Sequence, residues 1–207
     1  MGVQGQSARR GLSLPAQRLP RERRTRQAIV LLQSLHTDGT AHAHGRSLLE
    51  HLVGTAQLLL AWNAPLDHVL AGLCHSVYGT QAFRKISLAH AQRPRLQQLI
   101  GRRAEALVWL FSTLRRPACL LKASAGGHCL VRTRAGRSRH LDPDTLGALF
   151  VIECANLLDQ GVSLALARRL LKLARRHAVT PPAMLQALQK EMRLALYARS
   201  RIHISSH

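Results

Sequence analysis

Three polar positions interrupt otherwise apolar stretches of the chain. They are His51 in LLEHLVGT, His75 with Ser76 in GLCHSVYGT, and Glu153 with Asn156 in VIECANLLDQ. A histidine or carboxylate on a core-facing helix stripe is costly unless it forms hydrogen bonds or binds a metal ion. Helical bundles build metal sites from the side chains of facing helices, so the three positions together predict one buried polar pocket.

Helices must position these side chains, and local signals indicate where two of them begin or end. Ser47 and Glu50 form a capping box, S-x-x-E, which predicts a helix over 47–62 with His51 one turn inside it. A following helix over 63–75 is expected to stop where Gly79 offers a left-handed cap. Further helices are expected at 26–36, 96–114, 142–160, 163–177 and 181–199.

The composition favours an all-α fold, because most of the apolar residues are Leu and Ala and aromatic residues make up only 3% of the chain. We expect a bundle of about six or seven helices with a small β-hairpin near 128–141. Residues 1–26 are predicted to be a disordered Arg-rich tail, 27–160 the helical domain, and 161–207 a C-terminal helical extension packed on that domain.

Basic residues dominate the charge of the chain. Thirty Lys and Arg against ten Asp and Glu give a formal net charge of +20, a field that attracts polyanions. Arg168, Lys172, Arg175 and Arg176 recur every three or four residues, so they are predicted to share one helix face that is either simply solvated or binds anions. The N-terminal tail is open to the same two interpretations, and its composition also resembles that of an organelle transit peptide.

The cysteines and the apolar runs indicate the compartment. The four cysteines include no CxxC pair and sit mainly among apolar neighbours, as expected of reduced, buried thiols. No apolar run reaches the length of a membrane span, and the N-terminus lacks the apolar region of a secretory signal. These features predict a cytoplasmic protein without a membrane partner.

The order of the polar positions resembles that of the HD superfamily of metal-dependent phosphohydrolases. His51, then His75 at the end of an AGLCH helix, then a late IECANLLDQ helix follow the layout of that family. The similarity is closest to the ppGpp-hydrolase domains of stringent-response enzymes and covers roughly residues 44–160. The segment HSVYGT also resembles the hallmark of an uncharacterised group of HD-like proteins, His-Ser-(Val/Ile)-Tyr-Gly-Thr.

The resemblance implies that His51 and His75 are metal ligands. It places Ser76 and Asn156 at positions where the family has aspartates. Without those two carboxylates, two imidazoles and an amide remain. That set carries too little negative charge for Mn²⁺ or Mg²⁺, which prefer oxygen ligands.

Three alternatives follow for the pocket. In the first, Glu153, one helical turn before Asn156, supplies the missing carboxylate, and the site holds Fe(II) or Zn²⁺. In the second, His44 folds back as a further ligand. In the third no metal binds, and the histidines form hydrogen bonds with Ser76, Tyr78, Glu153 or Asn156 in a relic site or a small-molecule pocket. Most of the other histidines, His42 among them, are expected to be ordinary surface residues.

Two functions are therefore predicted. The first is a metal-dependent hydrolase or oxygenase that acts on a small phosphorylated or polar substrate. It would use Fe, Mn or Zn and have Glu153 or Tyr78 as a proton relay. The second is a non-catalytic basic module that binds nucleic acid or an acidic partner through its arginines.

Overall fold

A computed structural model describes residues 22–42, 45–177 and 180–204 of the chain. The described part is mostly helical with one two-stranded sheet, so the predicted all-α class is confirmed. The first twenty-one residues of the predicted tail lie outside it. In chain order the elements are α1 (Arg23–Ser34), α2 (Leu48–Ala61), α3 (Leu66–Cys74), η2 (His90–Gln92), α4 (Arg93–Ile100), α5 (Arg102–Thr113), α6 (Ala118–Gly126), β1 (Leu130–Arg132), β2 (Ser138–His140), α7 (Pro143–Gln160), α8 (Leu164–Ala174) and α9 (Pro182–Ile204).

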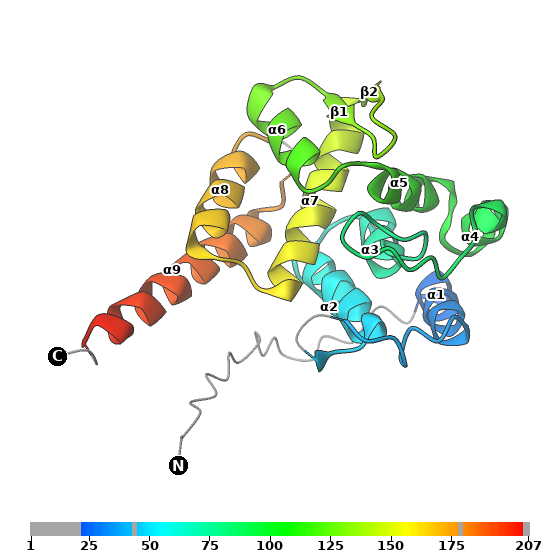
Figure 1. Cartoon of the computed structure of the whole chain (residues 1–207), viewed down its shortest axis with the longest axis horizontal. Helices are drawn as coiled ribbons and strands as arrows, with labels where there is room; N and C mark the ends of the chain where they lie inside the picture. Colours follow the sequence, from blue (N-terminus) through cyan, green and yellow to red (C-terminus); the bar gives the residue numbers. More distant parts are fainter. Residues whose placement is uncertain (1–21, 43–44, 178–179, 205–207) are drawn as a thin grey trace, which may run out of the picture.

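Helix α7 runs through the middle of the molecule (Figure 1). It contacts α2, α3, α5 and α6, and every residue from 146 to 156 is buried. A helix buried on all sides must satisfy any polar side chain from within the protein. The polar residues of α7 therefore need partners on the neighbouring helices.

The start of α2 has the predicted capping box. The Ser47 hydroxyl accepts from the Glu50 backbone N–H at 3.2 Å, and a Glu50 carboxylate oxygen accepts from the Ser47 N–H at 2.6 Å. These hydrogen bonds hold the pKa of Glu50 below its usual value. The cap fixes the first turn of the helix and so places His51 one turn inside it.

The end of α3 lies next to the predicted residue 75, but the expectation that Gly79 caps this helix is wrong, because the C-cap is His75. The helix ends at Cys74, His75 is its C-cap, and turns lead to Gly79, whose φ is +70°. A Cβ atom at Gly79 would lie 3.1 Å from the carbonyl oxygens of Arg84 and Lys85. Glycine is thus favoured both by the left-handed conformation and by the close approach of the chain.

Two other helix boundaries differ from the predictions, and one helix was not predicted. The helix expected over 96–114 is two helices, α4 and α5, because Gly101 between them has φ +94°. The first helix begins at Arg23, inside the predicted tail, because Glu22 caps it by accepting from the Thr25 N–H. Helix α6 was not predicted from the sequence. The predicted hairpin is present, and Leu130 pairs with His140 in antiparallel register.

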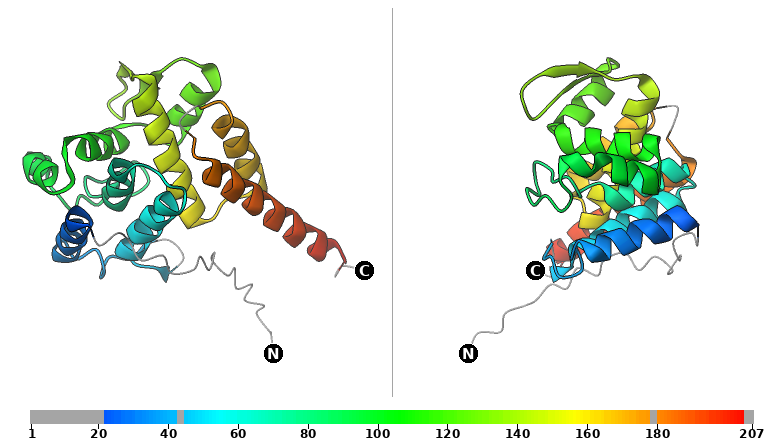
Figure 2. Two further views of the ribbon diagram at one scale, coloured as in Figure 1. Left: turned by 180° about the vertical axis from the view of Figure 1, so that it is seen from behind. Right: turned by 90° about the vertical axis from the view of Figure 1, so that its right-hand side faces the viewer.

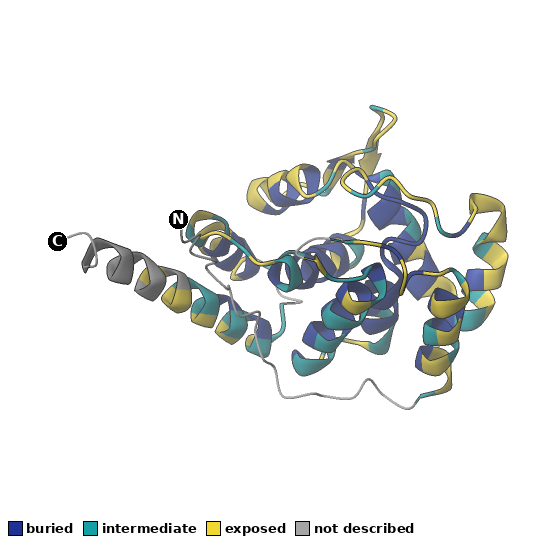
Figure 3. Cartoon of the chain, turned by 60° about the horizontal axis from the view of Figure 1, so that its bottom comes forward, coloured by how far each residue is buried: buried dark blue, intermediate teal, exposed yellow. Residues whose placement is uncertain are grey.

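The C-terminal helices α8 and α9 lie beside α7, on the side away from α1 and α4 (Figure 2). Leu170 and Leu173 of α8, with Met184 and Leu188 of α9, belong to the same hydrophobic core as the preceding helices. Buried residues gather on the faces that the helices turn toward one another (Figure 3). In the described residues, no helix combines the length and the apolar character that crossing a bilayer requires.

Replacement of Ser47 by Ala should lower the free energy of unfolding by about 1 kcal/mol, because the Glu50 backbone N–H in the first turn of α2 loses its side-chain acceptor. Urea unfolding followed by circular dichroism measures the change. Ser138→Ala, an exposed serine of the hairpin, is the control and should have little effect. Equal midpoints for the two variants would contradict the capping role.

Candidate metal centre

The two predicted histidines meet in the core. His51 on α2 and His75 at the end of α3 are each 1% exposed, and their Nε2 atoms are 3.2 Å apart. Asn156 of α7 joins them, since its Oδ1 lies 3.1 Å from His51 Nε2. Three of the residues singled out from the sequence thus converge on one point between three helices.

The outer nitrogen of each ring has a partner that can only accept. His51 Nδ1 donates to Asp159 Oδ2 at 2.6 Å, and His75 Nδ1 donates to the Gly72 carbonyl oxygen at 2.7 Å. Burial, with the nearby His51 and Arg116 as smaller contributions, holds the pKa of His75 well below its usual value. His75 is therefore neutral at neutral pH, and the lone pair of its Nε2 atom faces His51.

Glu153, predicted as a ligand and proton relay, faces a different partner. Both of its oxygens accept from Arg116 Nη1, at 3.1 and 2.9 Å, and the pair is almost fully buried. Glu153 also accepts from Asn156 Nδ2 at 3.3 Å, and this contact turns the Asn156 oxygen toward His51. In this arrangement Glu153 does not reach the two histidines but orients the Asn156 side chain that contacts His51.

Asp159 is the main residue of the centre that the sequence reasoning missed. It lies one turn after Asn156 on α7, a spacing that could have revealed it. Its carboxylate also accepts from Arg46, which balances its charge. A Cβ atom at Gly54 would collide with Asp159 Oδ1, so the glycine lets α7 bring this carboxylate close to α2.

A loop before α2 covers one side of the centre. The His42 ring stacks on the His51 ring with centroids 4.4 Å apart, and it meets Phe83 edge-on. The expectation that His42 is an ordinary surface residue is therefore wrong. Gln160, which donates to Asn156 Oδ1 at 3.0 Å, lies at the same edge. His44, the alternative further ligand, lies outside the described residues.

Tyr78, predicted as a proton relay, belongs to a second buried network. Its hydroxyl donates to Glu105 Oε1 at 3.1 Å, and Glu105 also accepts from Arg93 and Gln97. Burial acts to raise the pKa of Glu105, but these hydrogen bonds outweigh it and the pKa is lowered. Arg93 also lies over the Trp109 ring at 4.2 Å. The network ties the HSVYGT segment to α4 and α5, which is a structural role.

The donor atoms suit some metal ions better than others. Two imidazole nitrogens and one amide oxygen fit Zn²⁺ or Fe(II), whereas Mg²⁺ and Mn²⁺ prefer oxygen ligands. Within the described ranges, no group of three or more His, Cys, Asp or Glu side chains is placed to hold a metal. A metal at this centre would therefore need the amide oxygen of Asn156 as its third protein ligand.

The predicted anion-binding residues lie along α8 and just after it. Arg168, Lys172 and Arg175 are exposed. Arg176, also exposed, donates to the Ala125 carbonyl oxygen at 2.9 Å and so links the end of α8 to α6. Arg168 and Lys172 lie on α8, whereas Arg175 is its C-cap and Arg176 lies in the turn that follows.

Comparison with known proteins gives one match. Residues 31–116 are similar to a domain of unknown function, DUF6817. The matched region contains His51, His75 and Arg116, but it ends before α7, which carries Asn156 and Asp159. Neither the curated proteins nor the solved structures give a match.

Replacement of Arg116 by Met should destabilise the protein by about 3–5 kcal/mol, because Glu153 would remain buried without a counter-ion. Urea unfolding measures the change. Adding Glu153→Leu to that variant should recover much of the loss, since no unpaired charge then remains.

The matched control is Arg115→Met, because Arg115 precedes Arg116 in the chain and is exposed. It should shift the unfolding midpoint little. If Arg115→Met and Arg116→Met destabilise the protein equally, the buried ion pair is not the origin of the effect.

Proposed function

We propose that the protein is an HD-like, metal-dependent hydrolase whose buried centre holds one divalent cation, with Zn²⁺ as the best fit. Its substrate would be a small phosphorylated or polar molecule. The proposal rests on the convergence of three donor atoms, in which His51 Nε2 lies 3.2 Å from His75 Nε2 and 3.1 Å from Asn156 Oδ1.

The protons on the rings support a cation at this point. The carboxylate of Asp159 and the Gly72 carbonyl fix a proton on the Nδ1 atom of each histidine. When both rings are neutral, each Nε2 lone pair points inward, where it meets the lone pairs of Asn156 Oδ1. Lone pairs this close repel one another, and a metal ion among them would relieve the repulsion. The nearby Gln160 Nε2 donates to Asn156 Oδ1 at 3.0 Å and lies farther from His51 Nε2, at 3.5 Å.

The residues around the centre have the roles that such a site requires. A divalent cation would act as a Lewis acid and activate water for hydrolysis. Asp159 orients the His51 ring, as carboxylates behind metal-binding histidines do. Glu153, held by Arg116, is a positioning residue for Asn156. His42 and Gln160 are only partly buried, so a substrate would approach from their side.

Untagged protein should bind one Zn²⁺ per chain, measured by metal analysis after dialysis and by competition with a chromophoric chelator. His51→Ala and His75→Ala should each abolish stoichiometric binding, because each removes one nitrogen donor. Asp159→Asn should weaken binding about 10- to 100-fold, since it removes the carboxylate that orients the His51 ring but no metal ligand. His140→Ala, at an exposed hairpin histidine, is the control and should leave binding unchanged.

The hydrolytic part has its own readout. Phosphate release from a panel of small phosphomonoesters should depend on Zn²⁺ and disappear in His75→Ala. If none of Zn²⁺, Fe²⁺ or Mn²⁺ binds stoichiometrically when supplied during expression and purification, the metal proposal fails. The centre would then be a hydrogen-bonded cluster of His51, His75 and Asn156.

A second candidate function, the binding of nucleic acid or another polyanion, is favoured by a different observation. The sequence has no Asp or Glu between Glu105 and Asp142. The hairpin within that stretch exposes four arginines, and α8 adds its own exposed cations. The hairpin arginines are Arg132, Arg134, Arg137 and Arg139. A surface of this charge would bind phosphates without reading a sequence.

Binding of a labelled RNA or DNA oligonucleotide should weaken steeply as the logarithm of the salt concentration rises. Arg137→Gln with Arg139→Gln should reduce the salt slope by about one for each of the two arginines that binds a phosphate. His75→Ala should bind like the unaltered protein, because the histidine centre is buried and takes no part. No retention at low salt in a shift assay would exclude this function.

A further inference from the structure

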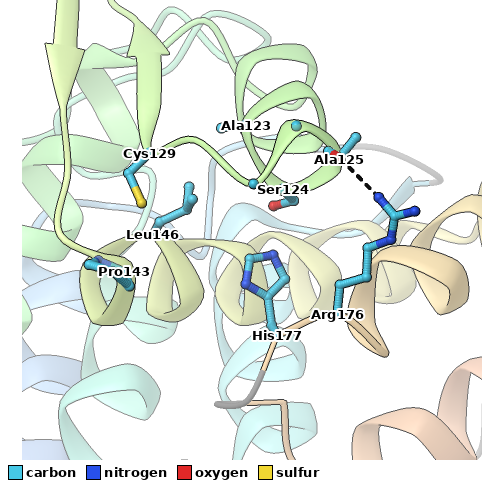
Figure 4. Close-up of a pocket in the computed structure, with 10 residues that line it drawn as sticks. Ala123, Ser124, Ala125, Cys129, Pro143, Leu146, Arg176 and His177 are labelled. Carbon is cyan, nitrogen blue, oxygen red and sulfur yellow. Dashed lines mark hydrogen bonds between the residues drawn. The ribbon is translucent and has the colours of Figure 1, made fainter.

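A cavity of about 370 Å³ lies away from the histidine centre, between α6, the start of β1, the first turns of α7 and the end of α8 (Figure 4). Its volume lies in the range of cavities that hold small molecules. None of its lining residues belongs to the metal centre. Ser124, Arg176 and His177 contribute its polar side chains.

Two polar atoms at this cavity are buried without a partner. Ser124 is 4% exposed, and its hydroxyl forms no hydrogen bond in the described part of the protein. The Nε2 atom of His177 is likewise buried and unpaired, while the ring stacks on Phe150 with centroids 4.8 Å apart. In Figure 4 both side chains lie against the same space. Buried polar groups are rarely left unsatisfied, so this pair indicates a bound group that would complete the hydrogen bonds.

The charge around the cavity indicates the sign of that group. Among the described residues that line the cavity, Arg176 is the charged side chain and none is a carboxylate. One guanidinium nitrogen of Arg176 is anchored on the Ala125 carbonyl, which leaves donors of its fixed fork for a ligand. Burial lowers the pKa of His177, so this ring is neutral at neutral pH and offers a hydrogen bond without charge.

The rest of the lining is apolar. Ala123, Pro143 and Leu146 form much of it, together with the half-buried Cys129. A ligand that satisfies both parts has an oxyanion at one end and an apolar body at the other. We propose that this cavity binds a small anionic molecule, whose oxyanion accepts from Ser124 Oγ and Arg176 and whose apolar body lies against Leu146.

Two sources of the oxyanion, a carboxylate and a phosphate monoester, share this chemistry. Benzoate and phenyl phosphate, compared by isothermal titration calorimetry on the full-length protein, distinguish them because they differ only in the head group. Inorganic phosphate is a third probe that lacks the apolar body. We expect one saturable site per chain for benzoate or phenyl phosphate and weaker binding of inorganic phosphate.

Ser124→Ala and Arg176→Gln should each weaken binding of the preferred probe about tenfold or more, since each removes a donor to a charged oxygen. Arg169→Gln, at an exposed arginine on α8, is the matched control and should bind normally. His75→Ala should also bind normally, so the result is independent of the metal centre.

Stability separates a ligand-binding role of Ser124 from a structural one. Without ligand, Ser124→Ala should unfold at the same urea concentration as the unaltered protein or at a higher one, because the hydroxyl it removes has no partner. The proposal is overturned if no probe saturates at millimolar concentration, if Arg169→Gln weakens binding as much as Arg176→Gln, or if neither Ser124→Ala nor Arg176→Gln affects it.

Discussion

The hydrogen bond between His51 Nδ1 and Asp159 Oδ2, 2.6 Å long, joins α2 to the C-terminal end of α7, and the geometry of the centre depends on it. It places a proton on Nδ1 of His51, so that the Nε2 atom of this ring faces His75. Two residues, one in α2 and one in the loop before it, make room for this hydrogen bond and balance its charge. Gly54 leaves room for the carboxylate, and Arg46 balances its charge from the preceding loop. Gly54 and the Arg46–Asp159 ion pair thus help to hold the Asp159 carboxylate beside His51.

Polar residues inside α7 are compatible with a stable core because their hydrogen bonds form a connected network. Arg116 donates to Glu153, and Asn156 donates to Glu153 while accepting from Gln160. Each acceptor has a donor, so the desolvation cost of one residue is offset by the next. The same network leaves the oxygen of Asn156 no orientation other than toward His51. Core stability and the geometry of the centre therefore rest on the same contacts.

The sequence predicted the features that depend on local interactions. The capping box of Ser47, the stop near His75 and the apolar stretches of the helices all follow from neighbouring residues, and they placed both histidines correctly. It did not predict the partners of Glu153 or His51, because Arg116 is 37 positions from the first and Asp159 is 108 from the second. Contacts of that separation depend on how helices pack. The break at Gly101 was missed because the apolar spacing continues across it, and only its φ of +94° separates the two helices.

Charge balance at the centre explains what kind of cation it would select. Each buried or half-buried carboxylate nearby already has an arginine, Asp159 with Arg46 and Glu153 with Arg116. Neither carboxylate leaves a net negative charge to attract a hard cation such as Mg²⁺, which depends on anionic oxygen ligands. The attraction must come instead from the two imidazole nitrogens. Such a donor set favours ions that bind nitrogen strongly, in the order that places Zn²⁺ well above Mn²⁺. Since Ser76 and Asn156 add no negative charge and both nearby carboxylates are paired with arginines, a cation at this centre would have to be one that binds nitrogen well.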